Sequence, residues 1–101
     1  MSKTITTQQF QDTPELEDWK AGVGGASITF RIDSFTDGAD FVREIAAVAE
    51  ELDHHPDVEL RHGSVAVRTT SHDTGGLTSR DLELALRVTA LAQTHDFRPE
   101  G

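Results

Sequence analysis

The sequence predicts an α+β domain with a four-stranded antiparallel sheet and two long helices packed on one face. Residues 26–33 and 64–70 alternate apolar and polar side chains, which is the period of a half-buried strand. Residues 41–52 and 82–92 repeat apolar side chains at helical spacing. Each helical segment follows a pair of strand-like segments, and this order favours hairpins covered by helices on one side.

The strands are expected in two pairs. Trp19 lies on a short strand, which a glycine-rich turn at 21–25 joins to the strand at 26–33. The second pair is a hairpin over residues 58–70 that turns at His62–Gly63. A sheet covered by helices on one face leaves its other face partly wet, or free for a partner.

Both helices have boundary signals in the sequence. Thr36 or Asp37 is expected to cap the first helix, and Pro56 ends it because the residue before a proline disfavours the helical conformation. The second helix opens with the capping pattern T-x-x-D, from Thr78 to Asp81.

Length and composition limit what the chain can be. Its 101 residues suit a single domain over 1–101, with a loosely ordered N-terminal segment at 1–14 and a tail at 96–101. The absence of cysteine excludes disulfides and thiolate chemistry. No apolar run reaches the ~20 residues of a membrane span, and the N-terminus has no secretory pattern, so we expect a cytoplasmic location.

The charge balance excludes two classes of partner. Nine Lys and Arg residues stand against 18 Asp and Glu residues, which gives a formal net charge of −9. Binding to a phosphate backbone or to an anionic membrane requires clustered basic residues. We therefore expect neither nucleic acid nor membrane as a partner, whereas a neutral or aromatic small molecule fits.

Histidines at the ends of the predicted elements are the candidate chemical groups. His54 and His55 close the first long helix, and His72 follows the last strand. Imidazole titrates near neutral pH, so a cluster of histidines at one rim suits proton transfer to and from a substrate. Ordinary roles compete with this hypothesis, because histidine favours a helix C-terminus and Asp81 is explained by helix capping.

Two other chemistries fit the sequence poorly. His54, His55, His72 and Asp73 are metal-ligand types, but adjacent residues on a helix point about 100° apart. Ser71, His72 and Asp73 are the residue types of a hydrolase triad, but triad members meet by folding rather than as neighbours in sequence. The sequence therefore predicts neither a metal site nor a triad.

Two separated sequence motifs contain the candidate histidines. The first is E-x-L-x-H-H-P at residues 50–56, and the second is S-H-x-x-G-G-L-T-x-x-D at residues 71–81. Together they resemble the pterin-4α-carbinolamine dehydratase family. A hairpin lies between them, and the resemblance extends over roughly residues 19–91. The order and spacing of several motifs make it more specific than any single one.

The resemblance implies a reaction. Enzymes of this family are 4a-hydroxytetrahydrobiopterin dehydratases, hydro-lyases that convert a 4a-hydroxy-tetrahydropterin to quinonoid dihydropterin and water. They need no metal or organic cofactor. The activity recycles the pterin used by aromatic amino-acid hydroxylases, so such a hydroxylase is the implied functional partner, and a homodimer or homotetramer is the implied assembly.

The resemblance also implies residue roles. His54 would be the main general acid at the 4a-hydroxyl, His72 a second acid/base, and His55 a group that binds and orients the pterin. Glu50 would orient His54 from one helical turn away, and Asp81 would support the loop that carries His72. The other implied substrate-binding positions are Trp19, Pro56, Ser71, Asp73 and Thr74.

The resemblance leaves two further functions open. Members of this family also act as dimerisation cofactors of a transcription factor, which would make the chain a non-catalytic interaction protein. A related heterocycle could also replace the pterin. Activity measured on His54→Ala and His72→Ala separates an enzyme from a scaffold.

Overall fold

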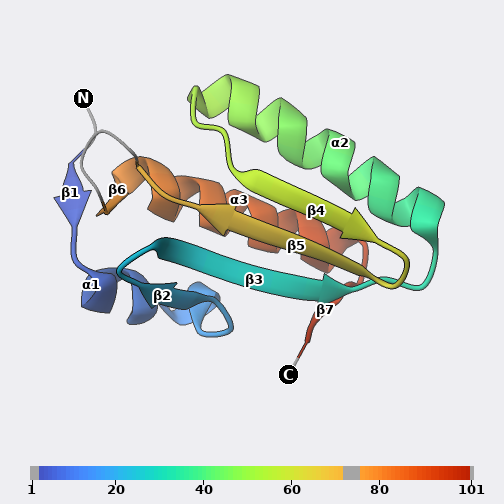
Figure 1. Ribbon diagram of the computed structural model, residues 1–101, viewed down its shortest axis with the longest axis horizontal. Helices are drawn as coiled ribbons and strands as arrows, with labels where there is room; N and C mark the ends of the chain where they lie inside the picture. Colours follow the sequence, from blue (N-terminus) through green and yellow to red (C-terminus); the bar gives the residue numbers. More distant parts are fainter. Residues whose placement is uncertain (1–2, 72–75, 101) are drawn as a thin grey trace.

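The computed structural model describes residues 3–71 and 76–100 as an α+β fold (Figure 1). Its elements in chain order are β1 (Thr4–Ile5), α1 (Thr7–Gln11), η1 (Pro14–Leu16), β2 (Lys20–Gly22), β3 (Gly25–Arg31), α2 (Phe35–Leu52), β4 (Asp57–Arg61), β5 (Ser64–Thr69), β6 (Leu77–Thr78), α3 (Ser79–Thr94) and β7 (Arg98–Pro99). The predicted fold class is confirmed.

The main sheet has the order β2-β3-β5-β4 and is antiparallel throughout. Phe30 of β3 and Val65 of β5 are register partners and are both buried beneath the helices. The helices α2 and α3 lie side by side on the face of the sheet to which these side chains point (Figure 1). On the opposite face, Ser27 and Arg68 are exposed.

The strand count differs from the prediction. Residues expected as a tail form β7, which pairs with the end of β3, so the main sheet has five strands. Phe97 packs this segment against the core. The centroid of its ring lies 5.3 Å from that of the Phe41 ring, and the ring stacks on that of His95 with a centroid distance of 4.9 Å. A strand of two residues has no periodicity, and its sequence therefore did not reveal it.

The N-terminal segment is also more structured than predicted. Thr6 caps α1 in a capping box with Gln9, and β1 pairs with β6. Phe10 and Leu16 are completely buried in the core. These two apolar anchors hold a segment whose overall composition is polar.

The end of α2 sets the position of the histidine pair. The helix begins at Phe35, where Ser34 rather than a later residue acts as the N-cap. It ends at Leu52, and Asp53 adopts a left-handed conformation with φ 51°. This turn releases the chain from helical geometry before His54 and directs it into β4.

Within the described ranges, no helix has the length and apolar character to span a membrane.

Candidate active site

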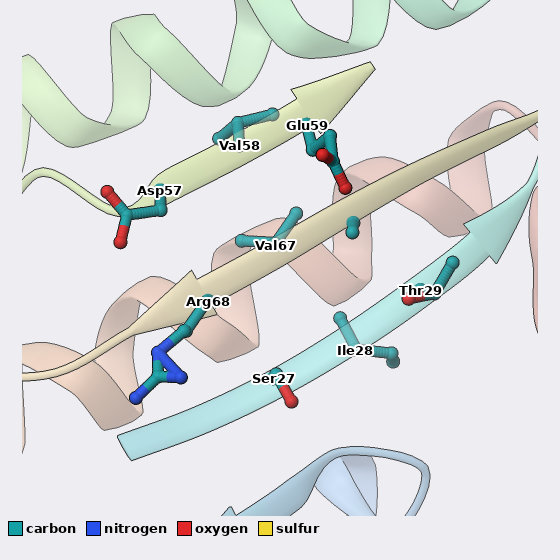
Figure 2. Close-up of a pocket in the computed structure, with 9 residues that line it drawn as sticks. Ser27, Ile28, Thr29, Asp57, Val58, Glu59, Val67 and Arg68 are labelled. Carbon is teal, nitrogen blue, oxygen red and sulfur yellow. The ribbon is translucent and has the colours of Figure 1, made fainter. Parts of the chain in front are cut away.

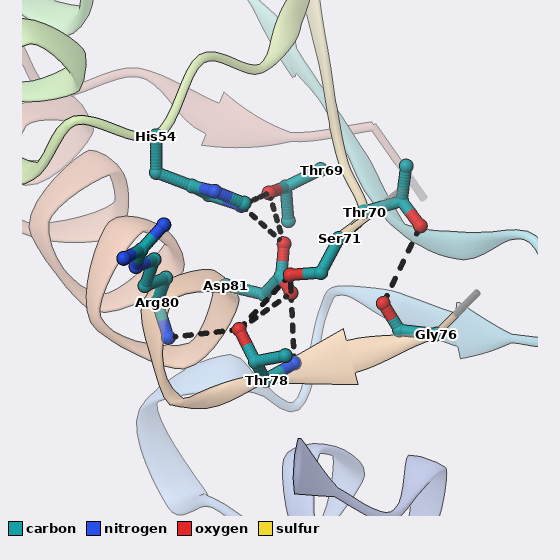
Figure 3. Close-up of polar contacts among 8 residues, drawn as sticks. All are labelled: His54, Thr69, Thr70, Ser71, Gly76, Thr78, Arg80 and Asp81. Atoms are coloured by element: carbon teal, nitrogen blue, oxygen red, sulfur yellow. Dashed lines mark hydrogen bonds and ion pairs between the residues drawn. The ribbon is translucent and has the colours of Figure 1, made fainter. Parts of the chain in front are cut away.

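His54 is held by a buried carboxylate from another element. Its Nε2 lies 2.7 Å from Oδ1 of Asp81 in the first turn of α3, and 3.2 Å from Oγ1 of Thr69 at the end of β5 (Figure 3). The His54 side chain is 10% exposed and that of Asp81 is 0% exposed. One side of the imidazole is therefore fixed in the protein interior.

Asp81 is the centre of this polar cluster. Its Oδ1 also accepts a hydrogen bond from the Thr69 hydroxyl at 2.5 Å. Its Oδ2 accepts from the Ser71 hydroxyl at 2.6 Å and from the Thr78 backbone N–H at 2.8 Å. A carboxylate that accepts hydrogen bonds from this many donors is stabilised in its ionised form.

The balance of burial and hydrogen bonding sets the charge of Asp81. Burial by itself would raise the pKa of its carboxyl, because the charged form loses hydration. The hydrogen bonds from Ser71, Thr69, His54 and the Thr78 backbone outweigh burial and hold the pKa below its ordinary value. At neutral pH the site therefore contains a buried negative charge against one nitrogen of His54.

Local chain geometry brings these groups together. Thr78 is the N-cap of α3 and forms the predicted capping box with Asp81. Ser71 pairs with Gly76 in an isolated antiparallel bridge, so the chain returns to the start of α3 just after β5 ends. The Asp81 carboxylate therefore lies next to Thr69 at the end of β5, and His54, which follows α2, meets it there.

His55 makes a different contact from His54. Its Nε2 pairs with Oε2 of Glu50 on α2. Both side chains are mostly exposed, at 58% for His55 and 76% for Glu50. The prediction that Glu50 orients His54 is therefore wrong. The helix ends at Leu52, so Glu50 and His54 do not keep the one-turn relationship that a continuous helix would give them.

A groove between α2 and β4 adjoins His55. It encloses about 500 Å³ and is mainly apolar, with the Glu50–His55 pair on its wall. Pro56, predicted to bind substrate, lines it as well. The remaining lining residues are Val42, Ile45, Ala46, Ala49 and Val58.

Trp19 does not line this site. It lies directly before β2, is 1% exposed, and belongs to the hydrophobic core. Its Nε1–H donates to Oγ1 of Thr89 on α3 at 2.9 Å, and its ring meets that of Phe10 edge-on at 6.0 Å. The interpretation of Trp19 as a pocket wall is wrong, because α1 and α3 cover the side chain.

The other predicted residues divide into two groups. His72, Asp73 and Thr74 lie outside the described residues. Ser71 is 4% exposed and its hydroxyl bonds to Asp81 and Thr78 inside the cluster. In the ranges 3–71 and 76–100, no group of three or more metal-ligand side chains is placed to hold an ion.

Sequence reasoning missed Thr69. Its position continues the apolar face of β5 after Val65 and Val67, and it is 1% exposed. A hydroxyl on the buried face of a strand needs a polar partner in the interior. That polar interruption of an apolar face was the available signal.

A second depression lies on the open face of the sheet (Figure 2). It encloses about 440 Å³ across β3, β5 and β4. Ser27, Thr29, Asp57, Glu59 and Arg68 are among its lining residues. None of its lining residues in the described part of the chain is a histidine, so we place the candidate site at His54.

Comparison with known sequences identifies relatives. A sequence model of the family described as Pterin 4 alpha carbinolamine dehydratase matches residues 3–91. A relative from Mycolicibacterium smegmatis is 36% identical over 75 residues, covering 74% of this chain and 80% of the relative. One from Halobacterium salinarum is 38% identical over 72 residues, covering 71% and 79%. Both are provisionally named as pterin-4-alpha-carbinolamine dehydratases.

The fold also matches a solved structure. A crystal structure described as a transcriptional coactivator/pterin dehydratase from Brucella melitensis superposes with a TM-score of 0.78 at 25% sequence identity. The match covers 89% of this chain and 98% of the other. With the family match over most of the sequence, the chain belongs to the pterin 4 alpha carbinolamine dehydratase family.

Proposed function

We propose that this protein dehydrates a 4a-hydroxy-tetrahydropterin to quinonoid dihydropterin, with His54 as its principal acid/base group. The observation that carries the proposal is the buried Asp81 carboxylate bound to His54. A fixed carboxylate orients an imidazole and stabilises its protonated form. Family membership supplies the substrate class.

The reaction is a redox-neutral elimination. The C4a–O bond breaks, the leaving oxygen takes a proton and departs as water, and a ring nitrogen loses a proton as the new double bond forms. Because no electrons enter or leave, proton donors and acceptors at the right positions are sufficient. An imidazole near neutral pH can act in either direction.

We assign the histidines different roles. His54 protonates the leaving hydroxyl, since the Asp81 carboxylate holds its ring in one fixed orientation. His72, assigned from its sequence motif, is the second acid/base group. His55 binds and orients the pterin together with Pro56, and both residues line the apolar groove beside α2.

The direct test is dehydration of freshly generated 4a-hydroxy-tetrahydropterin, followed by ultraviolet absorbance. Wild type should accelerate the spontaneous reaction, and His54→Ala should lower kcat by roughly 10²–10⁴-fold, the usual contribution of a general acid. His62→Ala is the matched control, because His62 is exposed in the β4–β5 turn. A folded wild type that fails to accelerate the reaction overturns the proposal.

We further propose a cytoplasmic homodimer or homotetramer that serves a pterin-dependent aromatic amino-acid hydroxylase. The outer edge of β4 is the end of the main sheet order, and free sheet edges favour association. Size-exclusion chromatography with light scattering gives the assembly state. A single protomer mass at working concentration contradicts the oligomer.

A second candidate function is that of a dimerisation cofactor for a transcription factor. The Brucella melitensis relative is described as a coactivator as well as a dehydratase. The two functions separate on one variant: His54→Ala removes turnover but leaves a partner-binding surface intact. A wild type that binds such a partner without turnover would favour the interaction protein.

A further inference from the structure

We propose that His54 exchanges its proton with the substrate through Nδ1, and that Thr69 is a positioning residue that keeps the other ring nitrogen, Nε2, protonated. The two ring nitrogens of His54 then have different roles, with Nδ1 toward the substrate and Nε2 bonded to Asp81 and Thr69. The link to the substrate rests on the proposed function, whereas the tautomer is a property of the free protein.

The hydrogen-bond partners of Nε2 determine where the ring proton lies. Asp81 Oδ1, at 2.7 Å, is a carboxylate oxygen and can only accept. The hydroxyl of Thr69 has one hydrogen, and it donates that hydrogen to Asp81 Oδ1 at 2.5 Å. At 3.2 Å from Nε2, the Thr69 oxygen can therefore only accept as well.

Two acceptors face the same nitrogen, so Nε2 must be the donor. In the neutral ring the lone pair then lies on Nδ1, because neutral imidazole carries one proton. In the protonated ring the second proton lies on Nδ1. Among the described residues, no hydrogen bond reaches Nδ1 of His54. We assign this nitrogen to the 4a-hydroxyl because Nε2 is already engaged by Asp81 and Thr69.

Proton transfer through Nδ1 leaves the interior cluster unchanged. Imidazolium donates the Nδ1 proton to the leaving oxygen and becomes the neutral Nε2–H tautomer. Asp81 and Thr69 bind that tautomer with the same donor-to-acceptor pattern as before. The ring needs no flip between its two protonation states, and the buried carboxylate keeps its charge.

Thr69 contributes to this arrangement through its hydroxyl. It is 1% exposed and shares Asp81 Oδ1 with His54. Replacing the hydroxyl by a methyl group, as in Thr69→Val, removes one donor from Asp81 and one of the two acceptors that face Nε2. The shape of the side chain is retained, so the change is mainly electrostatic.

The first experiment reads the tautomer by ¹⁵N NMR of the histidine side chains at a pH where the rings are neutral. His54 signals are assigned by their loss in His54→Gln. We expect the Nε2-protonated form for His54, and a mixture of tautomers for exposed His62. A His54 ring protonated on Nδ1 overturns the inference, and this readout requires no turnover.

The second experiment compares Thr69→Val with the conservative variant Thr69→Ser. Thr69→Val should lower kcat about tenfold, the size expected for losing one hydrogen bond to a charged group, with KM little changed. It should also move the pH profile of kcat, and Thr69→Ser should restore both. Thr29→Val, a half-buried residue on the open sheet face, is the matched control.

The outcomes separate this inference from the proposed function. An active wild type with Thr69→Val unchanged in kcat, pH profile and tautomer overturns the role of Thr69 alone. An inactive wild type with the Nε2–H tautomer overturns the dehydratase and leaves the assignment of the ring proton in place. If Thr69→Val does not fold, Thr69→Ala removes the same hydroxyl and takes its place in the comparison, and the wild-type spectrum still tests the tautomer.

Discussion

His54 and His55 are neighbours in the chain, but their rings pair with different carboxylates on different helices. His54 binds Asp81 of α3 in the interior, whereas His55 binds Glu50 of α2 at the surface. Their side chains are 10% and 58% exposed. The His-His pair therefore provides one fixed, mostly buried imidazole and one mostly exposed imidazole.

The surface pair should affect binding more than chemistry. We expect His55→Ala to raise KM severalfold and to leave kcat within about threefold of wild type. The reason is that the exposed ring binds the substrate and the transition state equally well. Glu50→Gln should have a smaller effect, since exposed ion pairs contribute about 0–1 kcal/mol. Steady-state kinetics at several pterin concentrations measures both. A loss of kcat as large as that of His54→Ala would place His55 in the chemical step.

Asp81 should make stability depend on pH in the acid range. Its pKa is lower in the folded protein than its ordinary value of 3.8, so the folded state releases this proton more readily than the unfolded chain. The resulting stabilisation is complete above the unfolded-state pKa and is lost as pH falls through the folded-state pKa.

Asp81→Asn tests this linkage. At neutral pH it should lower the free energy of unfolding by about 3 kcal/mol, because it breaks a buried charged network. The difference from wild type should shrink below about pH 4, where the unfolded wild-type carboxyl begins to bind its proton. Urea unfolding followed by Trp19 emission at several pH values measures it, with Asp33→Asn as a control for charge removal. A difference that stays constant down to pH 2 contradicts the prediction.

Trp19 should matter for stability and not for substrate binding. Trp19→Phe loses the hydrogen bond to Thr89 and leaves part of a buried site empty, at a cost of roughly 1–3 kcal/mol. Chemical unfolding followed by circular dichroism gives the value, and Thr89→Val isolates the hydrogen bond. KM of the folded variant should equal that of wild type. A raised KM would support the interpretation that Trp19 lines the substrate pocket.

Gly25 should tolerate no side chain, because two separate features oppose one. Its φ is +121°, and an added Cβ would lie 2.9 Å from Cβ of Thr70 and would also meet the carbonyl oxygen of Thr69. Gly25→Ala should therefore destabilise the protein by about 2 kcal/mol or more.

Gly22 provides the matched control for this hairpin. It pairs with Gly25 in the β2–β3 register, and an added Cβ there would have no neighbour within 4 Å. Gly22→Ala should change the free energy of unfolding by less than about 1 kcal/mol. Equal effects of the two substitutions in denaturant unfolding would argue against the strain at Gly25.

Elements with a clear period could be predicted from the sequence, and the site could be predicted in part. The alternation in β3 and β5, the apolar stripe of α2 and the capping box at Thr78 are local patterns, and all appear in the structure. The strand β7 could not be found in this way, because the packing of Phe97 against Phe41 creates it.

The sequence by itself determined the candidate chemistry of this protein, since its residue types include His54, His55 and Asp81 in the family's motifs. The tertiary structure decided which groups meet. The left-handed turn at Asp53 separates Glu50 from His54, and the capping of α3 brings Asp81 there instead. A partner that lies 27 positions away in the chain leaves no local period, because only packing brings the two elements into contact.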